Sequence, residues 1–182
     1  MLIMLRLSRH QVCACSSLLV SLFALTACMN PGQPSAPPLP ALATPFVAAD
    51  TNLAAAINDA DLTQIALATL AQTHAARSDI AQLGTVIVKN LTDNRTSLVA
   101  LATTSKATMA EKPFTHSQKV IDQMQHLHGA TFDKNYVRYL ASSTKTTIAH
   151  LDAESVASKN TDLLKISGDL KTKLLGYTMQ IQ

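Results

Sequence analysis

The chain has 182 residues, of which 47% are hydrophobic and 15% charged, with no tryptophan and three tyrosines. Its formal net charge is +3. If Arg6 and Arg9 leave with an N-terminal signal, 13 basic residues remain against 12 acidic ones, a net charge of about +1. Because no Lys or Arg cluster is present and few aromatic rings are available to stack on bases, the composition argues against nucleic-acid binding.

The first 28 residues have the three parts of an export signal: a basic start, an apolar run over residues 16–25 and small residues before Cys28. A membrane-spanning helix fits poorly, because serines and cysteines interrupt the run and prolines rather than basic residues follow it. The final Leu-Thr-Ala-Cys resembles the lipobox of bacterial lipoproteins, whose peptidase cuts before a diacylglycerol-modified cysteine. We therefore predict a signal peptide over residues 1–27 and lipidation of Cys28. The alternative is an ordinary secretory signal with a chance cysteine.

Cysteine usage agrees with a lipid anchor. Cys13 and Cys15 lie in the segment to be removed, so the mature chain keeps Cys28 alone and forms no internal disulfide. Several acyl chains, at about 0.8 kcal/mol per buried methylene, hold a lipoprotein on its membrane. In a Gram-negative source, Met29 in place of an aspartate after the cysteine favours the outer membrane, facing the periplasm, over the inner membrane.

Residues 28–45 read as a tether that follows the lipidated cysteine. The segment contains six prolines among small residues: Pro31, Pro34, Pro37, Pro38, Pro40 and Pro45. Such a segment cannot bury a core and favours extended polyproline conformations, at about 3.1 Å per residue. Residues 46–182 are rich in Ala, Leu, Thr and Lys, which predicts one helical domain with its own core.

Apolar side chains recur at helical spacing in the first half of this domain. The first helix is predicted over residues 47–75 and the second from an N-cap at Ser78. Because the connection around residues 77–79 is so short, the two helices should be antiparallel neighbours. The predicted inward faces consist of Leu53, Ile57, Ala60, Gln64, Leu67 and Ala71, and of Ile80, Gly84, Ile87, Leu91, Asn94, Leu98 and Leu101.

A break over residues 105–113 precedes a short helix, which a capping box of Thr115 and Gln118 should begin and which should end near Gly129. The third long helix is predicted over residues 132–158, and the fourth begins after a cap at Asn160 or Thr161. Their inward faces are predicted to be Val137, Leu140, Thr144, Ile148 and Leu151, and Leu163, Ile166, Leu170, Leu174, Tyr177 and Ile181.

The predicted fold class is therefore all-α. Two antiparallel pairs joined by a long connection indicate a four-helix bundle, with the short extra helix in the crossover between the second and third long helices. Ferritin-like folds have this layout. A simple up-and-down bundle is the alternative.

Three runs of residues resemble a ferritin-like family of exported bacterial proteins known only as a domain of unknown function. They are Gln-Ile-Ala-Leu-Ala-Thr-Leu-Ala over residues 64–71, Val-Ile-Val-Lys-Asn over residues 86–90, and Phe-Asp-Lys-Asn-Tyr over residues 132–136. The resemblance covers residues 53–181. Its most specific part is the Phe-Asp-x-x-Tyr motif at the start of the third long helix. The resemblance implies an exported helical bundle.

Members of that family carry a glutamate on the first helix, Asp-His or similar pairs on the second and third, and a histidine near the end of the last. By spacing, the resemblance places these metal-ligand positions on Gln64, on Asn90-Leu91, on Ser143-Thr144 and on Tyr177. The side chains at Gln64, Leu91, Thr144 and Tyr177 are neutral here, so this chain looks like a degenerate member. All four also lie on the predicted inward faces.

Metal binding is not expected at this layer. A ferritin-like di-metal site needs several inward carboxylates and histidines, typically with Glu-x-x-His on two helices. The chain has two glutamates, Glu111 and Glu154, and no Glu-x-x-His or Asp-x-x-His. Because buried unpaired charges are costly, neutral replacements are the stable way to refill such a layer.

The remaining histidines suggest no site of their own. His116, His126 and His128 would form at most a chance surface metal site, and we expect them to be solvated. His150 and Glu154 are four residues apart and should form a surface ion pair. His74 is expected in the last turn of the first helix, where the helix C-terminus favours imidazolium.

The sequence therefore favours a lipid-anchored, non-enzymatic helical bundle with a binding or structural role in the cell envelope. It has no Gly-x-Ser-x-Gly elbow and no phosphate loop, and no cofactor is expected. Its expected partners are the membrane, through the anchor, and an envelope protein or a small ligand. Two alternatives follow from other observations. The resemblance implies a metal-binding or oxidative-stress protein, and tyrosines between helices suggest a carrier of a small apolar molecule.

Overall fold

The computed structural model describes residues 44–181, which form five helices and no strand. The helices are α1 (Ala48–His74), α2 (Ser78–Thr104), α3 (Thr115–Met124), α4 (Gly129–Ser155) and α5 (Thr161–Gln180). The all-α prediction is confirmed. The predicted signal peptide, Cys28 and nearly all of the predicted tether lie outside the described residues.

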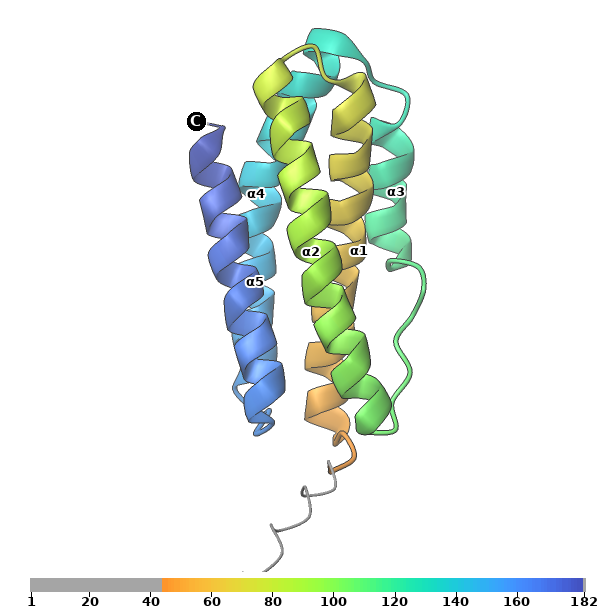
Figure 1. Ribbon diagram of the computed structural model, residues 1–182, viewed down its shortest axis with the longest axis vertical. Helices are drawn as coiled ribbons and strands as arrows, with labels where there is room; N and C mark the ends of the chain where they lie inside the picture. The colour runs from red at the N-terminus through yellow and green to blue at the C-terminus, as the bar shows by residue number, and fades with distance from the viewer. Residues whose placement is uncertain (1–43, 182) are drawn as a thin grey trace, which may run out of the picture. The chain divides into compact units, whose positions relative to one another are not determined.

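The four long helices pack side by side, and α1 is the most central of them (Figure 1). It packs mainly against α2 and α4, α5 packs against the same two helices, and α3 lies on the outside against α1 and α4. The connection from α2 to α4 runs back along the length of the molecule through residues 105–114 and α3 (Figure 1). α2 and α4 therefore run in the same direction.

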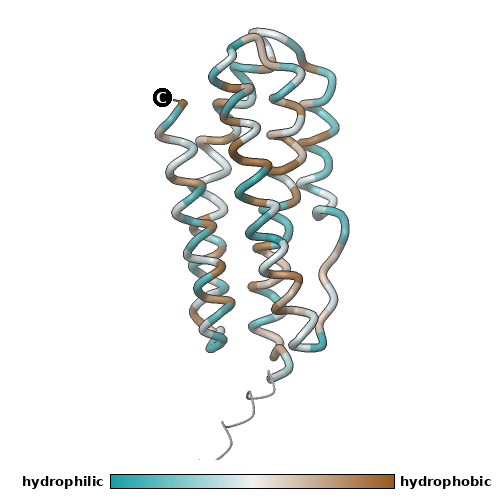
Figure 2. The backbone as a smooth tube through the Cα atoms, in the orientation of Figure 1, coloured by the Kyte–Doolittle hydropathy of each residue, from teal (hydrophilic) through white to brown (hydrophobic). Residues whose placement is uncertain are grey.

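The core follows the predicted faces, with hydrophobic and hydrophilic stretches alternating along each helix (Figure 2). Of the predicted inward residues, all but Leu101, Val137, Ile148 and Ile166 are buried, and these four are partly buried. The periodicity of the apolar residues thus predicted the facing of all four long helices. The amphipathic faces are stabilised by burial of apolar area, at about 25 cal/mol per Å².

Helix starts were predicted less well. Asn160 caps α5 as expected, because its side chain accepts a hydrogen bond from the Leu163 N–H at 3.0 Å. Ser78, by contrast, is already inside α2, and Arg77 occupies the N-cap. The capping box predicted at Thr115 and Gln118 is also wrong, because α3 is capped by a side chain from another helix, described below.

Three helix boundaries also differ from the prediction. The short helix ends at Met124, and α4 begins at Gly129 rather than at residue 132 and ends at Ser155 rather than at residue 158. Gly129 has a φ of +60°, which lies in the left-handed region that glycine adopts without strain. The glycine therefore marks the corner between α3 and α4 as well as the first residue of α4.

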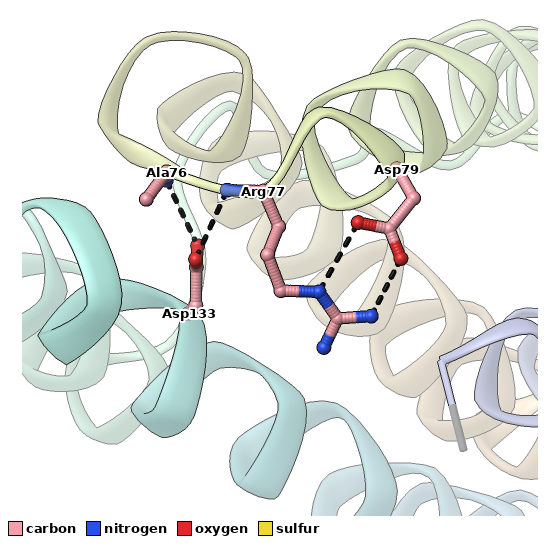
Figure 3. Close-up of polar contacts among 4 residues, drawn as sticks. All are labelled: Ala76, Arg77, Asp79 and Asp133. Atoms are coloured by element: carbon pink, nitrogen blue, oxygen red, sulfur yellow. Dashed lines mark hydrogen bonds and ion pairs between the residues drawn. The ribbon is translucent and has the colours of Figure 1, made fainter.

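The Phe-Asp-x-x-Tyr motif at the start of α4 has a structural role. Phe132 and Tyr136 are fully buried and stack with their ring centroids 5.4 Å apart. Between them, the carboxylate of Asp133 accepts hydrogen bonds from the backbone N–H groups of Ala76 and Arg77, at 3.2 and 3.1 Å (Figure 3). The motif thus fixes α4 to the turn between α1 and α2.

No helix within the described residues is long and apolar enough to cross a membrane.

Candidate functional site

The four positions that the resemblance assigns to metal ligands lie inside the domain. They are Gln64, Leu91, Thr144 and Tyr177. Each comes from a different long helix and is at most 3% exposed. Two of them hydrogen-bond to neutral neighbours: the Gln64 amide donates to the Ser143 hydroxyl at 3.2 Å, and Thr144 accepts from the Thr178 hydroxyl at 3.1 Å.

These side chains do not fit a ferritin-like di-metal centre. An amide, an alkyl group, a hydroxyl and a phenol offer none of the carboxylate or imidazole donors that such a centre uses. Within residues 44–181, no three His, Cys, Asp or Glu side chains gather closely enough to hold a metal ion.

The interior nevertheless contains a charged residue that the sequence analysis missed. Asp61 on α1 is 0% exposed and accepts one hydrogen bond, from the Asn94 amide at 2.9 Å. Its second oxygen, Oδ1, has no hydrogen-bond partner among the described residues. The prediction of neutral side chains concerned the layer of Gln64, Leu91, Thr144 and Tyr177, and Asp61 lies outside that set.

Burial raises the pKa of Asp61 from its ordinary 3.8 to about 7. The hydrogen bond from Asn94 and the positive charges of Lys173 and Arg95 oppose this increase. Lys173 approaches the same group from α5, because its ammonium donates to the side-chain oxygen of Asn94, Oδ1, at 3.4 Å. Asp61 thus belongs to a polar cluster at the meeting point of α1, α2 and α5.

Other buried polar groups are also left without partners among residues 44–181, including the hydroxyls of Tyr136, Tyr177 and Ser167. Burial raises the pKa of both tyrosine phenols, so they stay neutral at physiological pH. A neutral phenol has no charge with which to bind a cation or to act as a base. These groups therefore add polarity to the core without adding charge.

A groove on the outside of α1 is the feature best suited to hold a ligand. It lies between α1, α3 and α4 and has a volume of about 390 Å³, within the range of small-molecule sites. α1 supplies Ala60, Thr63 and Gln64 to its wall, among others. α4 supplies a continuous polar face at helical spacing: Tyr139, Ser142, Ser143, Thr146, Thr147 and His150.

Asp59 holds the third wall of the groove in place. Its carboxylate accepts hydrogen bonds from the Phe114 N–H at 2.5 Å and from the Ser117 hydroxyl at 2.8 Å. Both groups lie at the N-terminus of α3. There a carboxylate accepts hydrogen bonds from N–H groups that have no partner within the helix, and its negative charge interacts favourably with the helix dipole. Asp59 therefore caps α3 from α1, in place of the capping box predicted from the sequence.

Two buried polar atoms belong to residues in the groove wall. Thr63 and Gln64 are each 3% exposed, and Thr63 Oγ1 and Gln64 Oε1 have no hydrogen-bond partner among the described residues. The amide nitrogen of Gln64 is engaged by Ser143 on α4. Buried polar groups usually have a partner, so two such atoms beside one groove require an explanation.

His116, His126 and His128 are exposed, which agrees with the prediction that they are solvated. His116 lines the groove with its Nε2 atom 3.9 Å from the Asp59 carboxylate, whereas His128 stacks on His74 with ring centroids 4.1 Å apart. His150 also lines the groove, and no ion pair joins it to Glu154 among residues 44–181. The predicted His150–Glu154 pair is therefore wrong.

Apart from Ser143 and His150, which were singled out for other reasons, the groove residues on α4 were missed because they carry no recognisable motif. Serines and threonines on one helical face read as a solvated surface when the neighbouring helix is unknown. The predicted crossover helix could have indicated the groove, because a helix in the crossover must cover part of α1 or α4.

Comparison with known proteins gives a family but no characterised relative. Neither the curated proteins nor the solved structures contain a match to this chain. One family model, described as "Domain of unknown function (DUF4142)", matches residues 35–177. This range includes α1 to α4, most of α5 and every groove residue. The protein therefore belongs to the DUF4142 family, which confirms the expected resemblance to a family of unknown function.

Proposed function

We propose that this protein is an exported, lipid-anchored binding protein of the bacterial cell envelope, whose helical domain holds a small ligand without chemical conversion. The groove between α1, α3 and α4 is the observation that carries the proposal, because it combines suitable volume with buried polar atoms that lack protein partners. The lipobox-like sequence ending at Cys28 supports the anchor. The anchor would be in the outer membrane, with the domain facing the periplasm.

The proposal includes a ferritin-like four-helix bundle with α3 in the crossover. Two features support this arrangement over a simple up-and-down bundle. The connection between α2 and α4 spans the length of the domain, and each long helix packs mainly against antiparallel neighbours while α2 and α4 run in the same direction (Figure 1). An up-and-down bundle would instead join α2 and α4 by a short loop as antiparallel neighbours.

The structure favours a binding role over the two alternatives. A metal-binding or oxidative-stress role would need donors that Gln64, Leu91, Thr144 and Tyr177 do not supply. A carrier of a purely apolar molecule would leave the hydroxyl, amide and imidazole groups of the groove wall without partners.

Fractionation of cells tests the anchor. Wild-type protein should incorporate labelled palmitate and sediment with membranes, whereas Cys28→Ser should lose the label and appear in the soluble fraction. Cys15→Ser is the matched control, because Cys15 lies in the predicted signal and its loss should change neither result. If Cys28→Ser stays with membranes as fully as the wild type, the anchor proposal is wrong.

Native mass spectrometry tests the binding role. Protein purified gently from its source should carry a small molecule in the groove. Ala60→Leu should abolish this co-purification, because Ala60 is 9% exposed and a larger side chain there would fill the groove. Ala141→Leu, on the exposed surface of α4, is the matched control and should retain the molecule. If Ala60→Leu retains it as well, another site holds the molecule and the groove does not.

A further inference from the structure

Hydroxyl groups recur along the groove wall, beside its apolar surface. Seven of its residues carry one: Thr63, Ser117, Tyr139, Ser142, Ser143, Thr146 and Thr147. Five of the seven lie on α4 at spacings of three or four residues, so they follow one face of that helix. A hydroxyl both donates and accepts hydrogen bonds. The hydroxyls of Ser142, Ser143 and Thr146 already donate to backbone carbonyls of α4 and remain acceptors, so this face suits a neutral ligand that donates hydrogen bonds.

Charged groups contribute little to the groove. No Lys or Arg is among the residues that line it, which gives an anion no permanent positive partner. Asp59 is the carboxylate in the wall, and both of its oxygens already accept hydrogen bonds from the start of α3. The remaining titratable groups that face the groove are His116, His150 and the Tyr139 phenol. An ionic ligand would therefore lose hydration with little compensation.

Burial raises the pKa of Tyr139, and the nearby negative charge of Asp59 raises it further. The phenol therefore remains a neutral donor and acceptor. Tyr139 and Phe114 also bring two aromatic rings to the groove, and Phe114 is 42% exposed. Aromatic rings pack well against C–H groups while hydroxyls bind the polar edge of the same molecule.

Thr63 and Gln64 complete the pattern. Thr63 Oγ1 and Gln64 Oε1, both buried and without protein partners, belong to two residues of the wall on the α1 side. An amide oxygen needs a donor, and a ligand with O–H groups supplies one at low cost after a small local adjustment. The Ser143 hydroxyl of α4 lies beside them, because it accepts a hydrogen bond from the Gln64 amide at 3.2 Å.

We propose that the groove binds a neutral, polyhydroxylated molecule of the size of one or two sugar units. Its hydroxyls would pair with the polar face of α4 and with Thr63 and Gln64, and its C–H face would lie on Tyr139 or Phe114. This inference rests on the proposed binding function and specifies the class of ligand.

Saturation-transfer NMR on the full-length mature protein, in a detergent without a sugar headgroup, tests the ligand class. Glucose, galactose, trehalose and maltose are the neutral probes, with inorganic phosphate and spermidine as charged probes, all at millimolar concentration. At least one neutral sugar should give transfer, and the charged probes should not compete with it. The double variant Thr146→Val and Thr147→Val should weaken sugar binding about tenfold, because two hydrogen-bonding hydroxyls are lost without a change in side-chain shape.

Thr96→Val is the matched control, because Thr96 is an exposed threonine on α2 outside the groove. It should bind sugar as the wild type does. Phosphate or spermidine binding that depends on the groove, without sugar binding, would overturn the ligand class and leave the binding function standing. Failure of every neutral sugar also overturns the ligand class. If Ala60→Leu in addition leaves co-purification unchanged, the proposed function of the groove fails as well.

Discussion

Asn94 on α2 donates a hydrogen bond of 2.9 Å to the buried carboxylate of Asp61 on α1, whose other oxygen has no partner among the described residues. A carboxylate in this position is poorly compensated as an anion, which is why its pKa rises to about 7. The domain therefore contains a group that takes up a proton close to physiological pH, at the junction of α1, α2 and α5.

The stability of the domain should fall as pH rises from about 4 to about 7. In the unfolded chain Asp61 ionises near 3.8, whereas in the folded chain it holds its proton up to about 7, so between these values the folded state binds more protons. The stabilising contribution of protonated Asp61 is thus fully present below its unfolded-state pKa of 3.8, and it is lost as the pH rises to its folded-state pKa of about 7. At about 1.4 kcal/mol per pKa unit, the loss amounts to a few kcal/mol.

Urea denaturation at pH 5 and pH 7.5 measures this effect. Asp61→Asn should be more stable than the wild type at pH 7.5 and should show a smaller difference between the two pH values, because the new amide oxygen can still accept from Asn94 without a charge. Asp169→Asn, at an exposed position on α5, should keep the wild-type pH dependence. An unchanged pH dependence in Asp61→Asn would show that Asp61 does not titrate in this range.

Asp61 also marks the limit of what the sequence could predict. Periodicity predicted the four long helices and their inward faces, because apolar side chains every three or four residues report burial directly. It could not predict that α1 is buried over a wider arc, since this depends on α3, α4 and α5 packing around it. Asp61 follows Ala60 directly and lies outside the single stripe that was predicted on α1.

The groove could not be predicted from the sequence for a related reason. A stripe of hydroxyls such as Ser142, Ser143, Thr146 and Thr147 is typical of a solvated helix face, and only the placement of α3 makes it one wall of a groove. The placement of α3 depends in turn on Asp59, more than fifty residues away in sequence. Local capping rules predicted Thr115 and Gln118 as the start of α3 because they consider neighbours in sequence alone.

Asp133→Ala should destabilise the domain by about 1.5–3 kcal/mol, because it removes a charged acceptor from the two backbone N–H groups of Ala76 and Arg77. Thermal and urea unfolding measure the change. Asp79→Ala, at the start of α2 beside the connection from α1, is the matched control. The Asp79 carboxylate pairs with the exposed Arg77 side chain (Figure 3), so its loss should have little effect. Equal losses from the two variants would contradict the role assigned to Asp133.

Asp59→Ala should release the start of α3 while leaving the four long helices folded. Without the carboxylate, the Phe114 N–H and the Ser117 hydroxyl lose their acceptor, and the α3 helix dipole loses a favourable charge. Hydrogen exchange should therefore accelerate in residues 114–124 and stay slow in α1, α2 and α5. The control is Asp122→Ala, which removes an exposed carboxylate from α3 itself. If hydrogen exchange in α3 accelerates in Asp122→Ala but not in Asp59→Ala, Asp59 does not cap α3.

Gly84→Ala should destabilise the contact between α1 and α2, although alanine is the better helix former. A Cβ at this position would lie 2.6 Å from the backbone oxygen of Ala68 and 3.2 Å from the Ala71 Cβ, so the two helices would have to move apart. Overpacking of this kind typically costs about 1–3 kcal/mol.

Gly168→Ala on α5 is the matched control, because its Cβ would meet no atom within 4 Å. There the gain in helix propensity, about 1 kcal/mol, should stabilise the protein. Opposite signs for the two variants in the same unfolding experiment are the expected result, and a stabilising Gly84→Ala would mean that α1 and α2 are not in such close contact.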